Sequence, residues 1–451
     1  MTMSMPNHRP NLLLALWLPL FAGCPTSSSE TQTQGTSASN TDGTTDPMAG
    51  TSGAGPTSTS VAPPSTATTM PGATCPDGNV DESEACDDGN AINGDGCNND
   101  CTESAALLWE YRSSANGSNE VRSVAVDADG SIVVGGQTTG LTRWIARFDS
   151  ELVPQWSQQY GVESHGQVQG VAVSAGALYA AGALFTDADG HDIWVARLSP
   201  DGAIEWEDSV SSGVGDDYLT QAVIRDDGDL IVAGIASGEG GAELWTRRYA
   251  ADGAVQWTAT YPTGAKSTTY SIGPGLSVTP DAVVVGSSLH KGDTYSEFLV
   301  AYPPGGGDPL WTRELPSTHG TILAIAGHAD GDLALAGVGE FAELMVRRMT
   351  TSGGLAWSSN GCTGKIARDM AIDGQGDIVV IGDGPSGQGS NVRLCKFAPD
   401  GTLRWGKDIN GGAGGDRGYT VAIDASDRII AGGEMLSEQF VEDAWLAIFA
   451  P

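Results

Sequence analysis

The chain has 451 residues, of which 40% are hydrophobic, and it carries 63 glycines and a formal net charge of −34. That length and apolar content allow a sizeable core, whereas a surface this acidic argues against nucleic acid as a partner. Short apolar runs bounded by Gly, Asp, Ser and Pro recur and amphipathic helical patterns are scarce, so the sequence predicts an all-β protein. The acidity suits an exported protein, or it serves solubility alone.

The N-terminal segment indicates export. A basic His8-Arg9 pair precedes the apolar stretch Leu12–Phe21, which is too short to span a bilayer and is typical of a signal peptide. The following Leu20-Phe21-Ala22-Gly23-Cys24 resembles the lipobox of bacterial lipoproteins. The resemblance implies removal of residues 1–23 and lipidation of Cys24, which would anchor the protein in the cell envelope, at the outer membrane or cell surface. The alternative is an ordinary secretory signal followed by an incidental cysteine.

Residues 24–74 form a predicted tether behind the lipidated cysteine. From Pro25 to Thr74 the chain has 23 Ser or Thr residues and no aromatic, Lys or Arg residue. Such a segment cannot bury enough apolar surface to offset the entropy of ordering it. We therefore expect a disordered spacer between the membrane and the folded part.

Residues 75–104 contain Cys75, Cys86, Cys97 and Cys101 but hardly any apolar residue. A segment this short and polar needs covalent links to hold a fold, so we expect a disulfide-rich module, with three pairings open. The runs Cys86-Asp87-Asp88-Gly89-Asn90 and Gly94-Asp95-Gly96-Cys97 resemble the cysteine-rich repeat of myxobacterial surface proteins.

Several side-chain oxygens of this module have the chemistry of Ca²⁺ ligands; they belong to Asp87, Asp88, Asn90, Asn93 and Asp95. Their spacing does not match an EF-hand, and Asp-Gly and Asn-Gly pairs are also ordinary turn formers, which is the interpretation we favour. A zinc site made by the four cysteines is a further alternative, against which an oxidising environment argues.

A repeat of about fifty residues covers the rest of the chain. Tryptophans recur 46 to 54 residues apart, at Trp109, Trp156, Trp206, Trp257, Trp311, Trp357 and Trp405. Glycines that end an apolar run recur with them, at Gly136, Gly182, Gly234, Gly286, Gly337, Gly382 and Gly433. Each unit contains four predicted strands with turns such as Asp129-Gly130 between them, the size of a propeller blade. We predict a seven-bladed β-propeller over residues 105–451.

The two ends of the repeat complete each other. The last unit has predicted strands at 420–423, 428–432 and 444–449 but no Trp strand, whereas Leu107–Tyr111 is an unpaired Trp strand at the start. Pairing these segments would close the ring and leave no long exposed edge. The units are similar to bacterial extracytoplasmic propeller repeats of the delta-60 and SBBP kinds, and more distantly to quinoprotein blades. This resemblance implies a fold and not an activity.

Two further residue types recur at a fixed position of the repeat unit, and we call each set a column. Trp144, Trp194, Trp245 and Trp445 occupy one position of the third strand, where we expect core packing. The basic column is expected to form a repeated ion pair with blade turns; it consists of Arg147, Arg197, Arg248, Arg348 and Lys396. Cys362 and Cys395 form either a disulfide or two separate buried thiols.

The sequence commits no residue to catalysis. The six His are scattered, with no HExxH pair and no G-x-S-x-G elbow. No cofactor is implied with certainty, and Ca²⁺ is suggested by a single loop with alternating carboxylates at Asp187, Asp189 and Asp192. A polar turn explains that loop equally well.

The candidate binding face is the funnel end of the propeller, where outer strands connect to the next inner strands. Arg and Tyr, which are enriched in recognition surfaces, occur there among the candidate residues Glu120, Arg122, His165, Gln167, Tyr218, Tyr270, His319, Arg368, Arg417 and Tyr419. A merely solvated rim is the alternative. We expect a monomeric, non-catalytic surface protein that binds an envelope protein or a polysaccharide. A glycan-active lyase or hydrolase with its site in the funnel, and an envelope-assembly scaffold, are the other hypotheses.

Overall fold

The computed structural model describes residues 75–451 apart from 82–83, 114–118, 162–164, 187–189, 214, 265–274, 292–293, 316–319, 351–352, 386–389, 413 and 438–440. The predicted signal peptide, Cys24 and the tether lie outside the described residues.

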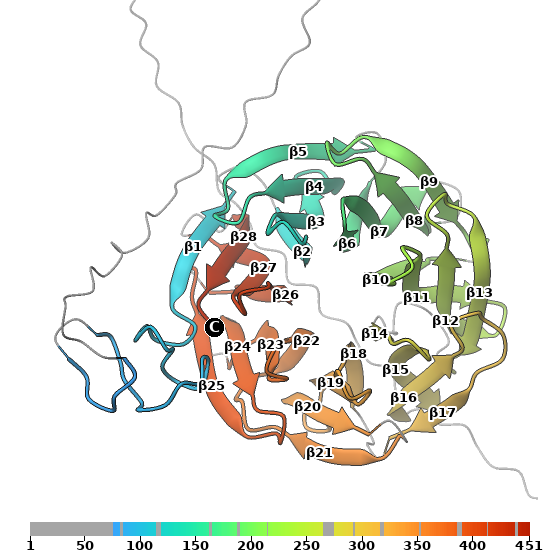
Figure 1. Cartoon of the computed structure of the whole chain (residues 1–451). Helices are drawn as coiled ribbons and strands as arrows, with labels where there is room; N and C mark the ends of the chain where they lie inside the picture. Colours follow the sequence, from blue (N-terminus) through green and yellow to red (C-terminus); the bar gives the residue numbers. More distant parts are fainter. Residues whose placement is uncertain are drawn as a thin grey trace, which may run out of the picture. The chain divides into compact units, whose positions relative to one another are not determined.

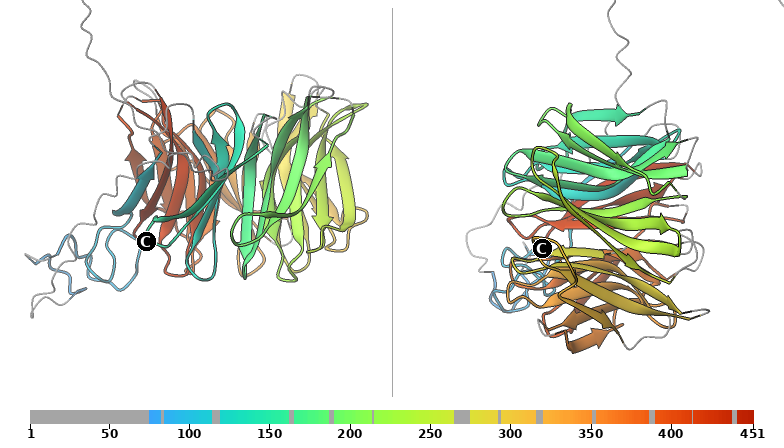
Figure 2. Two further views of the ribbon diagram at one scale, coloured as in Figure 1. Left: turned by 90° about the horizontal axis from the view of Figure 1, so that it is seen from above. Right: turned by 90° about the vertical axis from the view of Figure 1, so that its right-hand side faces the viewer.

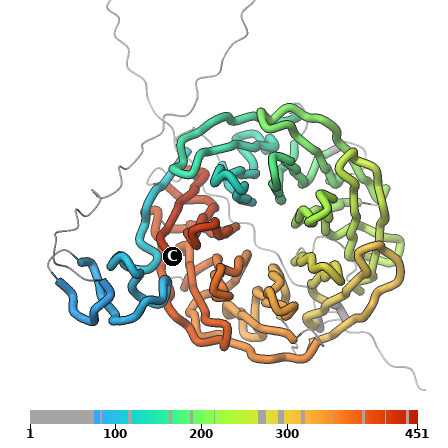
Figure 3. Tube along the Cα trace, viewed as in Figure 1, coloured from blue at the N-terminus to red at the C-terminus, as the bar shows by residue number. Residues whose placement is uncertain are grey.

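The described chain is all-β and forms a seven-bladed propeller, as predicted (Figures 1 and 3). Seven four-stranded antiparallel sheets stand around a central axis, and Figure 2 shows the strands running through the thickness of the disc. From the inner to the outer strand, blades 1 to 3 are β2(Glu120–Val126) β3(Ile132–Thr138) β4(Thr142–Phe148) β5(Pro154–Tyr160), β6(Gly166–Ser174) β7(Ala177–Thr186) β8(Gly190–Leu198) β9(Ile204–Val210), and β10(Tyr218–Ile224) β11(Leu230–Gly238) β12(Gly241–Tyr249) β13(Val255–Pro262).

Blades 4 to 7 are β14(Gly275–Val278) β15(Val283–Lys291) β16(Thr294–Tyr302) β17(Trp311–Glu314), β18(Thr321–Gly327) β19(Leu333–Val338) β20(Leu344–Met349) β21(Leu355–Ser359), β22(Ile366–Ile372) β23(Ile378–Asp383) β24(Val392–Phe397) β25(Leu403–Ile409), and β26(Arg417–Ile423) β27(Ile429–Leu436) β28(Glu442–Phe449) β1(Leu107–Arg112). Within the described residues no helix is present that is long and apolar enough to cross a membrane.

Burial follows the position of a strand in its blade. The second and third strands are buried on both faces because neighbouring blades pack against them, as in β3 and β4. The outer strands instead alternate, as in β9, where Trp206 is half-buried between exposed neighbours. The core is thus a series of interfaces between blades, for example Val133 of blade 1 packing with Val168 and Leu178 of blade 2.

The ring is closed by the pairing that the sequence predicts. Strand β1 pairs antiparallel with β28, with Leu107 opposite Phe449 and Arg112 opposite Trp445. Blade 7 therefore combines three C-terminal strands with one from the start of the domain, and its outer edge is covered (Figure 1). This closure removes the edge that would otherwise be open to aggregation.

A β-bulge in the inner strand explains the glycine column. In six of the seven sheets the pairing of the first two strands shifts by one residue, as between Val121 and Ser123 opposite Gly136 and Gly135. The shift brings a carbonyl oxygen of the first strand onto the marked glycine, so that a Cβ built on Gly136 would overlap the oxygen of Glu120. The same overlap occurs at Gly182, Gly234, Gly337, Gly382 and Gly433. Gly286 differs, because its Cβ would meet the side chains of Leu299 and Ile325.

The outer tryptophans of blades 1, 2, 3 and 5 donate a hydrogen bond to the next blade. The indole Nε1 of Trp156 donates to the carbonyl of Pro200, at 2.9 Å, in the turn between the third and fourth strands of blade 2. Trp206, Trp257 and Trp357 donate in the same way to Ala251, Pro304 and Pro399 of the next blade, at 3.1, 3.1 and 2.9 Å. A glycine of the turn lies against the ring, which leaves no room for a side chain at Gly253 or Gly401. We call this contact the tryptophan latch.

The predicted basic column reinforces the latches. Arg147, Arg248, Arg348 and Lys396 pair with acids of the first turn of their own blade, as predicted. Arg197 differs: it pairs with Glu205 at 3.0 Å, because the first turn of blade 2, around Ala175-Gly176, has no acid. Arg248 and Arg348 also donate to the latch carbonyls of Pro304 and Pro399, at 2.7 and 3.2 Å.

All six cysteines of the described chain form disulfides. The module pairs Cys75 with Cys101 and Cys86 with Cys97, and Cys362 pairs with Cys395 in blade 6. The module oxygens cap turns: Asp87 accepts backbone N–H groups of Asp77, Gly78 and Gly89 at 2.7 to 2.9 Å. These contacts support turn formation over Ca²⁺ binding in the module.

The glycine column yields a stability prediction. Gly382→Ala should lower the free energy of unfolding by roughly 2–3 kcal/mol, because the new methyl group must displace the bulge carbonyl of Ile366. Gly240→Ala is the matched control, since open space surrounds the Cβ position there. Urea denaturation monitored by tryptophan fluorescence measures both, and equal stability of the two variants would contradict the role of the bulge.

Candidate functional site

The candidate site is the cavity at the axis of the propeller. Its volume is about 440 Å³, and inner strands of all seven blades line it. The bulge residue of every bulged inner strand lies in its wall; these residues are Arg122, Gln169, Thr220, Leu323, Arg368 and Tyr419. The bulge thus turns one side chain of each of these six blades toward the channel, as bulges often do at functional sites.

Three of these residues form a compact group that we call the channel cluster: Arg122, Arg368 and Tyr419. They come from blades 1, 6 and 7, which are neighbours in the ring (Figure 1). The guanidinium carbon of Arg122 lies 3.8 Å from the Tyr419 ring centroid, and that of Arg368 lies 5.3 Å away. Two cations on one ring are within the range of cation–π attraction. Burial is the main cause that raises the pKa of the Tyr419 hydroxyl, which therefore stays protonated at neutral pH.

Each arginine of this region is held by a carboxylate. Arg368 donates to both oxygens of Asp383, at 2.8 and 3.1 Å, and Arg122 pairs with Glu120 of its own strand. Beside them Arg417 pairs with Glu434, whose pKa is raised by burial and by the nearby Glu120. The side chains of Arg122 and Arg368 remain 25% and 28% exposed, so both are positioned yet reachable from the cavity.

Asp369 ties the three blades of the cluster together. Its carboxylate accepts hydrogen bonds from the backbone N–H of Met370 at 2.8 Å, of Val421 at 2.9 Å and from the Thr420 hydroxyl at 3.0 Å. The Thr420 oxygen in turn accepts from the backbone N–H of Val124, at 3.1 Å. These bonds connect blade 6 through blade 7 to blade 1. Burial raises the pKa of Asp369 to about 6, despite the three donors.

The opposite wall of the cavity carries no charge. Gln169 and Thr220 supply amide and hydroxyl groups from blades 2 and 3, and Leu323 supplies an apolar side chain from blade 5. The cavity therefore joins an arginine-tyrosine wall to a neutral polar wall. Such a combination can contact both hydroxyl groups and the apolar faces of a ligand.

A second group of aromatic side chains lies outside the cavity lining. We call it the aromatic row: His165, Phe185, His191 and Tyr218, whose successive ring centroids are 6.4, 5.2 and 5.2 Å apart. The Nδ1 of His191 lies 3.2 Å from a carboxylate oxygen of Asp216 and 3.5 Å from the Tyr218 hydroxyl. The backbone N–H of His191 also donates to Asp216, and this bond is the main cause that lowers the pKa of that carboxyl group.

Most of the described residues predicted for the binding face lie in one of two places, the cavity wall or the aromatic row. Arg122, Arg368 and Tyr419 come together in the cavity wall, with Glu120 and Arg417 beside them. His165 and Tyr218 belong to the aromatic row, and Gln167 lies on β6 opposite Ala183. Tyr270 and His319 lie outside the described residues.

The sequence analysis missed Gln169, Thr220 and Asp369. The bulge position can be recognised by its distance from the marked glycine. Arg122, Thr220 and Arg368 each lie 14 positions before the marked glycine of their own blade. In blade 2 the separation between Gln169 and Gly182 is 13.

The described chain offers little support for a metal site. Asp187 and Asp189 lie outside the described residues, and Asp192 is buried on β8 opposite Leu184. The described side chains close enough to share an ion are those of Cys75, Glu84, Asp87 and Cys101. Both cysteines are in a disulfide and Asp87 caps backbone turns, so this group serves the module as structure.

Comparisons with known proteins bear on the fold. No family model and no curated protein sequence matches the chain. Among solved structures, the chain is similar to the WD40 β-propeller domain of Doa1, with 12% identity, a TM-score of 0.50 and coverage of 77% of this chain and 96% of that one. Other similar structures are a streptogramin B lyase (14% identity, TM-score 0.48, coverage 75% and 96%) and the polysaccharide lyase Uly1 (12% identity, TM-score 0.47, coverage 73% and 90%). At 12% identity, the likeness to the Doa1 domain shows the propeller fold alone and leaves the specific function open.

The raised pKa of Asp369 predicts a pH dependence. A carboxyl group with a pKa near 6 in the folded state and about 3.9 unfolded binds its proton more tightly when folded, so its contribution to stability increases as pH falls from about 6 to 4. Asp369→Asn cannot titrate. The wild type should therefore gain roughly 2–3 kcal/mol relative to this variant between pH 7 and pH 4.

Chemical denaturation across this pH range measures the difference. Asp252→Asn, in an exposed turn of blade 3, controls for the loss of one negative charge. Parallel stability profiles for wild type and Asp369→Asn would show that Asp369 titrates as an ordinary carboxyl group.

Proposed function

We propose that the protein is an exported, lipid-anchored surface protein whose propeller binds a polysaccharide or protein partner in the axial cavity without transforming it. The observation that carries the proposal is the channel cluster, in which two accessible guanidinium groups and a tyrosine converge from three blades on a cavity of about 440 Å³. Arg and Tyr contribute disproportionately to recognition.

The carboxylates around the cluster favour binding over catalysis. Glu120 is paired with Arg122, Asp383 with Arg368, and Asp369 accepts three hydrogen bonds. A general acid or base must be free to exchange a proton with a substrate. These described carboxylates are instead committed to positioning the arginines and joining the blades.

The proposed cellular location, at the membrane surface, is inferred from the N-terminal sequence. In this interpretation residues 1–23 are a signal peptide, Cys24 carries the lipid, 24–74 are the tether, 75–104 the disulfide-rich module and 105–451 the propeller. The protein would be a monomer that meets the membrane through its anchor alone. Its similarity to myxobacterial cysteine-rich repeats and to delta-60 or SBBP blades supports a surface location.

A glycan-active enzyme is the second candidate function. The paired His191 and Asp216, with the Tyr218 hydroxyl within 3.5 Å of the same ring nitrogen, favour it, because a histidine positioned by a carboxylate can act as a general base. In this case the aromatic row, and not the channel cluster, would hold the reacting groups.

The binding proposal predicts the effect of charge removal in the cavity. Arg122→Gln and Arg368→Gln should each weaken binding of a polysaccharide ligand about tenfold or more, since each removes a guanidinium group from the wall. Ligands are first found on an array of neutral and acidic glycans, and affinities are then measured by calorimetry. Arg147→Gln, in a blade ion pair outside the cavity, should bind as the wild type does.

Two results would contradict the proposal. Unchanged affinity in both cavity variants would show that the ligand binds outside the cavity. If the wild type shortens a glycan and His191→Asn does not, the protein is a glycan-active enzyme and not a binding protein.

The lipid anchor has its own test. Cells that express the protein are labelled with a clickable fatty acid, and the protein should carry the label in the membrane fraction. Cys24→Ser should lose the label and leave the membrane, with Cys86→Ser as the cysteine control that retains it. A wild-type protein that is secreted without label would indicate an ordinary secretory signal.

A further inference from the structure

Trp405 of blade 6 cannot form the tryptophan latch with a turn of the next blade. Each latch needs the turn between the third and fourth strands of the next blade, and the fourth strand of blade 7 is β1, from the other end of the domain. Because β28 and β1 come from opposite ends of the domain, no turn joins the third and fourth strands of blade 7, the blade that follows Trp405 of blade 6. The indole of Trp405 must find another acceptor, because a part-buried N–H group without one is costly.

The disulfide-rich module supplies this acceptor. Trp405 Nε1 donates to the carbonyl of Gly94 at 3.1 Å, within the 2.9 to 3.1 Å found for the other latches. Gly94 has a φ of 80°, which favours glycine, as do the latch glycines Gly253 and Gly401, with a φ of 88° each. A Cβ at Gly94 would overlap Nζ of Lys396, the residue that takes the arginine position in blade 6. The Asn93-Gly94 turn therefore occupies the place of a blade turn.

Further contacts surround this turn. Gln375 donates to the Asn93 carbonyl at 3.4 Å, and Lys407 Nζ donates to the Ala105 carbonyl at 2.6 Å. The backbone N–H of Ala105, the residue that follows the module, also donates to the carbonyl of Pro451, at 3.2 Å. In Figures 1 and 3 the module lies beside β25 and the C-terminal end of the chain.

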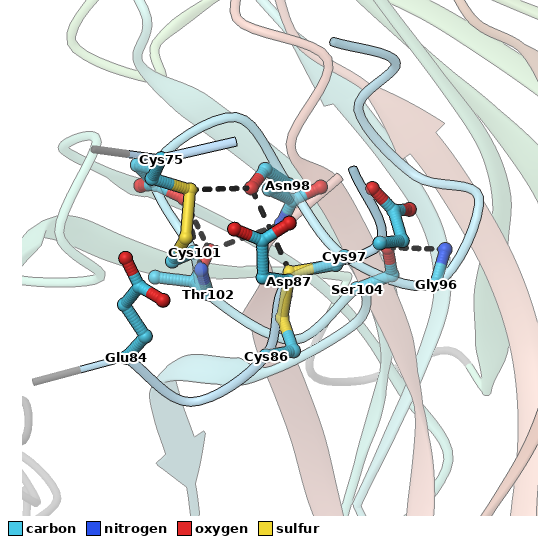
Figure 4. Close-up of a disulfide and its surroundings, with 12 residues drawn as sticks. Cys75, Glu84, Cys86, Asp87, Gly96, Cys97, Asn98, Cys101, Thr102 and Ser104 are labelled. Atoms are coloured by element: carbon cyan, nitrogen blue, oxygen red, sulfur yellow. Dashed lines mark hydrogen bonds between the residues drawn. A yellow bond between two sulfur atoms is a disulfide. The ribbon is translucent and has the colours of Figure 1, made fainter. Parts of the chain in front are cut away.

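The turn is preformed by the module itself. The Asn98 side chain accepts the backbone N–H of Gly94 at 2.9 Å, and Asn93 accepts that of Asn99 at 2.8 Å. Asn98 adjoins Cys97, and the disulfides Cys86–Cys97 and Cys75–Cys101 fix both sides of this loop (Figure 4). Without these links so polar a segment has no core to hold the turn in shape.

We propose that blade 6 carries a docking site, formed by Gln375, Lys396 and Trp405, whose ligand is the disulfide-held Asn93-Gly94 turn of the same chain. The docked module replaces the missing turn of blade 7 as the hydrogen-bond acceptor of Trp405. It stabilises the interface between blades 6 and 7, across which Arg368 and Tyr419 also meet. The inference does not depend on the proposed binding function.

A double-mutant cycle on the full mature chain tests the docking. Trp405→Phe keeps the ring but removes the donor to Gly94, and should lower Tm by about 1–3 °C. In a Cys86→Ser/Cys97→Ser background, where the turn is no longer held, Trp405→Phe should cost nothing further. Trp357→Phe is the matched control, because it removes the equivalent bond to Pro399 and should cost the same in both backgrounds. Serine variants are preferable to a reductant, which would also break Cys362–Cys395.

A second pair of variants keeps the disulfides intact. Gly94→Val should increase hydrogen exchange in β24, β25 and β28, since the valine cannot enter the docking site. Gly96→Val controls for backbone strain, because its φ of 147° is also positive but open space surrounds its Cβ position. Equal costs of Trp405→Phe in both cysteine backgrounds, or equal exchange in the two glycine variants, would overturn the proposal.

Discussion

The β-bulge of the inner strands is the constraint on which both the fold and the candidate site depend. It places a backbone carbonyl where the second strand would carry a Cβ, which is why glycine recurs there in six blades. The extra residue can no longer pair in the sheet, and its side chain lies in the channel wall. One irregularity thus accounts for a repeated glycine and for a variable residue. The glycine is the same in each blade because its role is steric, whereas the bulge residue differs from blade to blade.

The outer rim is organised by a different repeated interaction. Tryptophans on the outer strands of blades 1, 2, 3 and 5 each donate to the turn of the following blade and so join these neighbours. The pairing of β1 with β28 closes the sheet of blade 7. Because β1 comes from the other end of the domain, blade 7 has no turn to which Trp405 of blade 6 could donate. The disulfide-rich module lies at this position and contacts Trp405. A small domain that has no apolar core and a large domain with one missing contact therefore complement each other.

The repeat made most of the fold predictable. Tryptophan and glycine spacing fixed the number of blades, and the unmatched strands at the two ends predicted the closure that the structure shows. Disulfide pairing could not be predicted, because four cysteines in a polar segment are compatible with each connectivity. The site was predictable only in part: Arg122, Arg368 and Tyr419 stood out by residue type, whereas Gln169 and Asp369 depend on the bulge register and on contacts between blades. Sequence spacing does not reveal such contacts unless the bulge is recognised first.

Charge at the cavity bears on the kind of ligand that the channel cluster can hold. The chain has a net charge of −34, and its field opposes the approach of acidic polymers. The arginines of the cluster do not reverse this locally, since Glu120, Asp383 and Glu434 balance Arg122, Arg368 and Arg417. An anionic ligand would have to compete with these carboxylates, whereas hydroxyl groups can use the remaining N–H donors without breaking an ion pair. The geometry therefore favours a neutral, hydroxyl-rich ligand over an acidic one, because recognition here depends on oriented donors and a tyrosine face and not on net attraction.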